Sequence, residues 1–330
     1  FTTVSYRSLP QLRRWWKLPS GRHLAGRDLE SFSSLEKFIY SPYAWVLQHK
    51  AHLRAGPLSN LRLQPDSKLK GTLLHRLLDL VLAAPTAEID WRTAIQPLLS
   101  SWLEGRWQTL LEQEGANLLL PGRIADGAAL LESGKAALWE LFQQMRAAGV
   151  TTAASNVALP ATPFFGGNLG GIVDLVVESE SARAGVIDLK LGGRETREKE
   201  LADNRQLQLA VYGYLLARQR GGWPEGAFFI LGSRRMLAQT NRYLLNARVV
   251  APGTSSIGLQ SCWSDFERVW HWRRRQLDAG WIEVTAEGAD PEDRAPGVPE
   301  PVPPLPLWQA TEEHAKYNAF DALTGWRTDA

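Results

Sequence analysis

Leucines recur at helical spacing through the first half of the chain, and this periodicity predicts helices. The strongest pattern covers residues 70–83, whose apolar face is made of Leu73, Leu74, Leu77, Leu78 and Val81. Residues 88–148 are also predicted to be largely helical, with an interruption at Pro121 and Gly122. The first half of the chain is therefore expected to be mostly α-helical.

The period changes at about residue 151, where short apolar runs with glycine-rich connections predict β-strands. The predicted strands are 156–159, 172–177, 185–189 and 226–232. Helices are expected at 197–219 and 264–276, and the seven prolines of 289–307 predict extended chain. Strands interleaved with helices predict the α/β class, with residues 84–150 as a helical insertion.

Composition restricts the class of protein only moderately. A chain of 330 residues, 44% apolar and 22% charged, is typical of a globular protein with one large domain or two ordinary ones. The net charge is +2, so overall basicity is weak evidence for nucleic-acid binding. The consecutive Arg273, Arg274 and Arg275 fit a solvated helix face and a phosphate-binding surface equally well, and both interpretations stay open.

Cysteine usage and hydropathy exclude several kinds of protein. The single cysteine, Cys262, rules out an internal disulfide and any metal cluster built from cysteines. No apolar run is long enough to span a bilayer, and the first residues do not resemble a signal peptide. A cytoplasmic location is therefore expected.

Acidic residues lie within two of the predicted strands. Asp174 belongs to one apolar run, and Asp188 belongs to the next. Lys190 lies two positions after Asp188, so the side chains of these two residues point to the same face of the strand. Two close carboxylates repel each other unless a cation lies between them. Mg²⁺ and Mn²⁺ prefer oxygen ligands, so the two carboxylates and the carbonyl of Leu189 could hold such an ion. Lys190 would position or deprotonate a nucleophile and offset charge on a phosphate. The pattern indicates phosphodiester hydrolysis; the alternative is a half-exposed strand with a surface ion pair.

Four short motifs carry a resemblance to a known family. They are Gly71-x-x-x-His75, Gly171-x-x-Asp174, Asp188-x-Lys190 and Gln208-Leu-x-x-Tyr212. The series resembles the PD-(D/E)XK nuclease superfamily, and within it the RecB-like exonuclease domains, including the C-terminal domain of AddB-type helicase–nuclease subunits. The resemblance implies a restriction-endonuclease-like α/β fold, with a mixed central sheet flanked by helices.

The resemblance also implies roles for individual residues. His75 would be a metal ligand beside the two aspartates, although a histidine on a leucine-rich helix is more often a core group. Gln208 would orient Lys190 or a water molecule, and Tyr212, on the same helix face, would contact substrate or pack beside it. Many relatives carry a glutamate near the position of Asn156. Since an amide is a poor Mg²⁺ ligand, a leaner or more metal-selective site is expected here.

Many members of this family hold an iron–sulfur cluster with four cysteines from the two ends of the domain. The corresponding positions in this chain are Ser41, His314, Tyr317 and Thr324. None is a cysteine, and thiolates are what hold such clusters. We therefore expect no iron–sulfur cluster.

The expected organisation is a nuclease domain at 31–288, preceded by an arm or linker at 1–30. A proline-rich tether and clasp at 289–330 would pack on that domain.

The implied activity is metal-dependent hydrolysis of DNA, as an exonuclease or end-processing enzyme on single strands, in repair, recombination or defence. No P-loop motif occurs, so a helicase would be another chain or part of a longer protein. Two alternatives stay open: a catalytically silent DNA-binding scaffold, and a nuclease acting on RNA or in phage defence.

Overall fold

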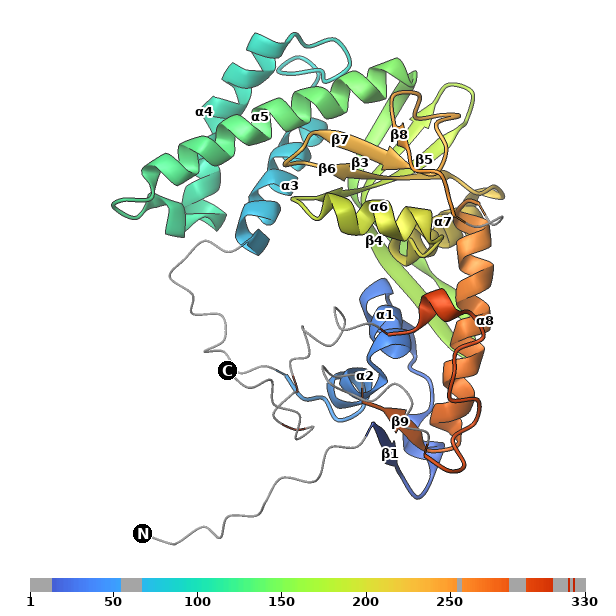
Figure 1. The fold of residues 1–330 in the computed structure, drawn as a ribbon. Coiled ribbons are helices and arrows are strands. Elements are labelled where there is room, and N and C mark those ends of the chain that lie inside the picture. Colours follow the sequence, from blue (N-terminus) through green and yellow to red (C-terminus); the bar gives the residue numbers. More distant parts are fainter. Residues whose placement is uncertain are drawn as a thin grey trace, which may run out of the picture. The chain divides into compact units, whose positions relative to one another are not determined.

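The computed structural model describes residues 14–54, 67–253, 257–284 and 295–310, together with Phe320 and Leu323. The chain divides into two compact units, whose elements are labelled in Figure 1. Unit 1 consists of Phe1–Pro57, Pro163–Asn168 and Ser264–Ala330; unit 2 consists of Leu58–Thr162 and Leu169–Trp263. The domain boundaries expected from the sequence stay a prediction.

A mixed sheet of seven strands carries the fold. In spatial order the strands are β2 (Leu29–Glu30), β4 (Gly167–Ser179), β5 (Ala184–Lys190), β6 (Glu225–Ile230), β7 (Arg235–Ala238) and β8 (Arg248–Val249), and β3 (Val150–Phe164) pairs with β4. β5–β6 and β7–β8 are parallel, whereas β4–β5 and β6–β7 are antiparallel. The predicted α/β class with a mixed sheet is confirmed. β3 extends far beyond the predicted 156–159, because its alternation relies on threonine, alanine and serine rather than large apolar residues.

Helices α3 (Ser67–Ala83), α4 (Gln96–Glu114) and α5 (Ile124–Ala147) cover one face of the sheet in unit 2 (Figure 1). The short helix η3 (Ala116–Leu119) and a turn at Gly122, with φ 85°, separate α4 from α5 as expected. The leucine face of α3 is buried in one core with α4, α5 and the sheet residues Leu175, Ile187, Leu189 and Phe229. Burial of that face drives these helices onto the sheet.

The single helix expected at 197–219 is instead two helices, α6 (Arg194–Ala202) and α7 (Leu207–Arg220). Asn204 ends the first with φ 54°, a conformation that asparagine tolerates better than most residues. Its buried amide accepts a hydrogen bond from Gln239 at 3.1 Å, and Gln239 in turn accepts one from Gln206 at 2.8 Å. This buried amide cluster favours a break that helical periodicity alone does not reveal.

Unit 1 contains short elements around an aromatic core. They are β1 (Trp15–Lys17), η1 (Gly21–Leu24), α1 (Phe32–Tyr40), α2 (Pro42–His49), β9 (Trp281–Glu283), η4 (Pro306–Trp308) and, from Ser264 onward, α8 (Leu259–Asp278). Trp270 stacks on Phe38 with ring centres 5.7 Å apart, and Phe38 meets Trp45 edge-on at 5.2 Å. β1 pairs antiparallel with β9 and buries Trp15. Residues 14–30, expected to form an irregular arm, are thus partly built into unit 1.

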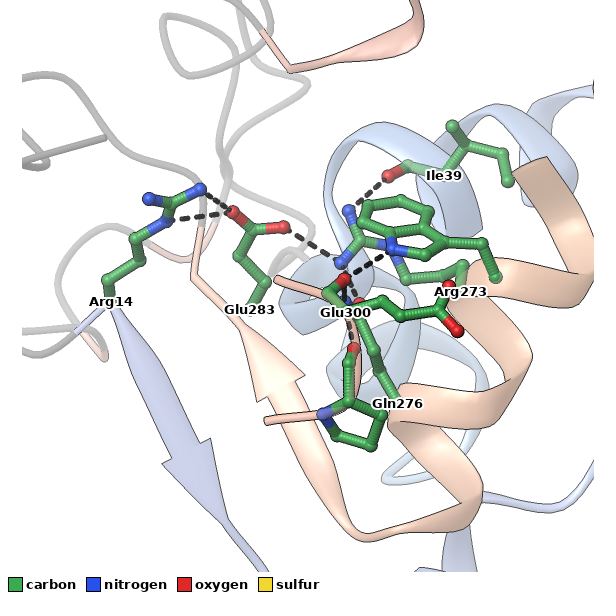
Figure 2. Close-up of polar contacts among 8 residues, drawn as sticks. Arg14, Ile39, Arg273, Gln276, Glu283 and Glu300 are labelled. Carbon is green, nitrogen blue, oxygen red and sulfur yellow. Dashed lines mark hydrogen bonds and ion pairs between the residues drawn. The ribbon is translucent and has the colours of Figure 1, made fainter. Parts of the chain in front are cut away.

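A buried ionic cluster joins the first and last parts of unit 1 (Figure 2). Glu283 accepts hydrogen bonds from Arg14 at 2.7 and 2.9 Å, and its other oxygen lies 2.8 Å from Nη1 of Arg273. Arg273 also donates to the carbonyl of Ile39 at 2.9 Å. One glutamate therefore pairs with two arginines that are far apart in the sequence.

Several expectations fall on parts of the chain outside the described residues. They concern residues 1–13 of the arm and three of the cysteine-equivalent positions, His314, Tyr317 and Thr324. The fourth such position, Ser41, is buried at the start of α2. In the described residues 295–310 the proline-rich stretch forms turns and η4, which buries Trp308. No helix within the described ranges has the length and apolar character needed to cross a membrane.

Candidate functional site

The two aspartates meet where β4 and β5 diverge. Leu175 and Ile187 are the last paired residues of these antiparallel strands, and Asp174 and Asp188 follow directly outward on either side. The backbone N–H of Leu189 donates to Oδ2 of Asp174 at 3.0 Å, which holds that carboxylate against β5. The sequence prediction that adjacent strands deliver two carboxylates to one place therefore agrees with the geometry.

Asp188 carries a carboxylate that is 0% exposed. Within the described structure neither of its oxygens accepts a well-formed hydrogen bond, although Nζ of Lys190 lies 2.8 Å from Oδ2 as an ion pair. Burial raises the pKa of Asp188 to about 7; the neighbouring charge of Asp174 also acts to raise this pKa, and Lys190 opposes the shift. A buried carboxylate with so little compensation favours a bound cation.

A chain of hydrogen bonds orients Lys190. Its ammonium donates to Oε1 of Gln208 at 2.9 Å, and Nε2 of Gln208 donates to the hydroxyl of Tyr212 at 3.1 Å. Burial raises the pKa of Tyr212, so this hydroxyl keeps its proton at neutral pH. A Cβ at Gly171 would lie 3.2 Å from Cε1 of Tyr212, so the glycine makes room for the ring. Lys190, Gln208 and Tyr212, which come from two different motifs, are thus joined by hydrogen bonds.

His75 reaches this group from α3. Its Nε2 lies 3.3 Å from the carbonyl oxygen of Leu189, and its Nδ1 lies 3.9 Å from Oδ1 of Asp174. A carbonyl only accepts, so Nε2 carries the ring proton whenever this hydrogen bond forms. Adjacent ligands of an octahedral Mg²⁺ are about 3 Å apart, which is close to the spacing of Nε2 and the Leu189 oxygen.

These donors suit a hard divalent cation in kind, since they comprise two carboxylates, one carbonyl and one imidazole. No cluster of three or more His, Cys, Asp or Glu side chains within the described residues already has the arrangement of a complete metal site. The ammonium of Lys190 and the hydrogen bond from His75 to Leu189 each engage a group that a metal would need. The residues therefore fit a cation once these two contacts give way.

Asp79 is a polar neighbour that sequence reasoning missed. It lies one helical turn after His75 on α3, and its Oδ2 accepts a hydrogen bond from Nδ2 of Asn156 at 2.7 Å. Arg76 also pairs with it at 3.2 Å. The spacing of four residues from His75 was the available signal, because it places both side chains on one helix face. Asn156 thus contacts a carboxylate from a different element.

The three consecutive arginines do not form one surface. Arg273 is 2% exposed and bound to Glu283, and Arg274 is 9% exposed and paired with Asp278. Only Arg275 has an exposed side chain, which pairs with Glu300. Both interpretations left open for this run, a solvated helix face and a phosphate-binding surface, require exposed guanidiniums, and Arg273 and Arg274 are instead engaged inside unit 1.

Comparison with known proteins adds an independent line of evidence. A family model described as the PD-(D/E)XK nuclease superfamily matches residues 30–287, well over half of the 330 residues, and this range includes every motif residue described above. A search of curated proteins finds no match to the chain. The extent of the family match and the site geometry agree: the chain belongs to the PD-(D/E)XK nuclease superfamily.

Proposed function

We propose that the protein is a DNA nuclease that uses Mg²⁺ or Mn²⁺ and acts on single-stranded or end-fed DNA. Members of its superfamily are usually metal-dependent nucleases that generally use these two ions. The observation that carries the proposal is the fully buried carboxylate of Asp188, which lies beside Asp174 and an oriented lysine. A purely structural site would not be expected to place a fully buried carboxylate so close to a second, partly exposed one.

Asp174, Asp188, the carbonyl of Leu189 and His75 would hold the metal. The ion would polarise the phosphate and acidify a bound water. Lys190 has three N–H donors, of which one points to Gln208 and another faces Asp188. The third is available for an oxygen of the phosphate or for the attacking water. Gln208 and Tyr212 keep this ammonium in place, so they act as positioning residues.

The test is a cleavage assay on end-labelled single- and double-stranded DNA with Mg²⁺, Mn²⁺ or EDTA. Asp188→Asn and Lys190→Ala are compared with Asp126→Asn and Lys135→Ala, which alter exposed acidic and ion-paired basic residues on α5. Cleavage that needs metal and is lost only in the first pair supports the proposal. DNA binding without cleavage by either metal would overturn it in favour of a catalytically silent scaffold.

The subtype and partners are part of this proposal. Similarity of the motifs to RecB-like domains supports an exonuclease that receives its strand from a helicase, either another chain or part of a longer protein. The same assay on labelled RNA distinguishes a DNA nuclease from the alternative, a nuclease that acts on RNA. Products that shorten from one labelled end indicate an exonuclease, whereas internal fragments of discrete length indicate an endonuclease.

A further inference from the structure

A basic pocket lies in unit 2 outside the residues assigned above. Its volume is about 430 Å³, and its walls come from α5, from the turn between β6 and β7, and from the segment that precedes β8. The lining residues that matter here are Trp139, Gln144, Arg234, Arg235 and Arg248. A pocket of this size can hold a nucleotide unit.

The charge of the pocket favours an anion. Arg234 and Arg235 are exposed and form no ion pair with any described residue, and Arg248 only approaches Glu198 at 3.6 Å. Glu140 is the acidic residue in the lining, and its Oε1 accepts a hydrogen bond from Gln144 at 2.8 Å. Three arginines against one hydrogen-bonded carboxylate leave a net positive pocket.

Two further groups suit a nucleic-acid base. Trp139 lines the pocket and is half-buried, and the guanidinium of Arg146 lies over its ring, 5.3 Å from the ring centre. Gln144 is 8% exposed, and its Oε1 accepts no hydrogen bond from a described residue. An aromatic face and an unused acceptor beside guanidiniums are the features that hold single strands by stacking and charge.

The pocket and the candidate active site lie at the same edge of the sheet. Lys190 is in register with Ile230 on β6, and Ile230 is in register with Arg235 on β7. The turn that follows β6 is also tied to β5, since Leu231 donates to the carbonyl of Lys190 at 2.8 Å. Two strand spacings, about 10 Å, therefore separate the backbone of Lys190 from that of Arg235.

We propose that this pocket binds the single-stranded DNA substrate close to the phosphate that is cleaved. Arg234, Arg235 and Arg248 contact its phosphates, and a base stacks on Trp139. The inference rests on the proposed nuclease function and assigns that function a substrate path across β6 and β7.

The test measures binding of fluorescent oligothymidylates by anisotropy in EDTA, where hydrolysis is prevented. The combined Arg234→Ala, Arg235→Ala and Arg248→Ala variant should bind at least about tenfold more weakly, and its log Kd–log salt slope should be smaller by about 2. The corresponding triple lysine variant should retain the slope. Trp139→Ala should weaken binding about tenfold with an unchanged slope. Arg183→Ala with Arg242→Ala, near the opposite ends of β5 and β6, is the matched control and should bind normally.

Substrate length separates this inference from the proposed function. Hydrolysis of a mononucleotide phosphodiester should be equal in the wild type and the triple alanine variant, because such a substrate does not reach the pocket. Suppose that the wild type cleaves normally and the triple alanine variant has normal affinity and a normal salt slope. This result would contradict DNA binding at the pocket and leave the proposed nuclease function intact. A wild type that never cleaves any phosphodiester with Mg²⁺ or Mn²⁺ would overturn the proposed function, and this inference with it.

Discussion

At the scale of single residues, the protonation of Asp188 is the most sensitive property of the site. Burial disfavours its carboxylate, Asp174 adds a like charge, and only the ammonium of Lys190 compensates. A divalent cation would supply the missing positive charge and compete with the proton for the same oxygens. Metal binding and proton binding are therefore linked at this residue.

The first prediction concerns this linkage. The pKa of Asp188, about 7 when folded, exceeds the ordinary 3.8, so between these values the folded chain holds a proton that the unfolded chain has lost. In EDTA, this residue's contribution to the free energy of unfolding should fall as pH rises from about 4 to about 7. The rise in Tm caused by Mg²⁺ should be larger at about pH 8 than at about pH 5.

Thermal unfolding with Mg²⁺ or EDTA at several pH values checks this linkage. Asp188→Asn should remove most of the Mg²⁺-induced rise, whereas Asp126→Asn, an exposed substitution on α5, should retain it. An equal rise at acidic and alkaline pH in the wild type would contradict the linkage.

The second prediction concerns Gly171. A Cβ at this position would lie 3.2 Å from the ring of Tyr212, whose hydroxyl accepts the hydrogen bond from Gln208. Gly171→Ala should shift the ring and misplace Lys190, lowering kcat roughly tenfold to a hundredfold while the protein stays folded. Steady-state cleavage kinetics measure this effect. Gly222→Ala, which meets no atom within 4 Å, is the control and should leave kcat unchanged.

At the scale of elements, α3 combines a structural face with a functional edge. Its leucines are buried against α4, α5 and the sheet, and the same helix presents His75 to the carbonyl of Leu189. Gly134 of α5 permits close packing, since a Cβ there would lie 2.6 Å from Cδ2 of Leu74. A Cβ at Gly71, one turn before His75, would meet no described atom within 4 Å, so packing does not require this glycine.

The third prediction follows from this contrast. Gly71→Ala should stabilise the protein by up to about 1 kcal/mol, because alanine favours a helix and meets no neighbour. It should nevertheless weaken DNA binding, since we expect the substrate backbone to pass close to Gly71. Denaturant unfolding and anisotropy measure the two effects.

Gly134→Ala is the matched substitution on α5. It should destabilise the protein by about 1–3 kcal/mol through overpacking against Leu74, while the binding groups stay intact. Unchanged DNA affinity in Gly71→Ala would show that the substrate does not need this glycine.

At the scale of the whole molecule, the candidate site and the buried ionic cluster belong to different units. All of the proposed metal and catalytic residues lie in unit 2, whereas Arg14, Arg273 and Glu283 lie in unit 1. The family match nevertheless spans segments of both units. A substitution in the ionic cluster therefore alters none of the proposed metal or catalytic residues.

The fourth prediction uses that separation. Glu283→Gln removes the negative charge that pairs with two buried guanidiniums and should destabilise unit 1 by about 3–5 kcal/mol. Hydrogen exchange should become faster in α1 and β9 and stay unchanged in α3 and β5. Mg²⁺ should still slow exchange in β5. Faster exchange across both units would show that they unfold as one.

Much of the site could be predicted from the sequence alone. The leucine spacing of α3, the apolar runs around Asp174 and Asp188, and the spacing of Gln208 and Tyr212 are local patterns, and local patterns report periodicity directly. They sufficed to predict the α/β class and to nominate Asp174, Asp188 and Lys190, whereas His75, Gln208 and Tyr212 were nominated by the resemblance of their motifs to the nuclease superfamily.

Only the tertiary structure decided which partners distant residues would find. The break at Asn204 depends on Gln239, the burial of Arg273 depends on Glu283 and Ile39, and the contact of Asp79 with Asn156 joins a helix to a strand. Each of these contacts links residues that are not neighbours in the chain, and no local periodicity encodes such a pairing. The sequence by itself determined which chemical groups the strands carry. Tertiary packing determined which polar residues lie together at the candidate site and which are engaged in contacts that stabilise the fold.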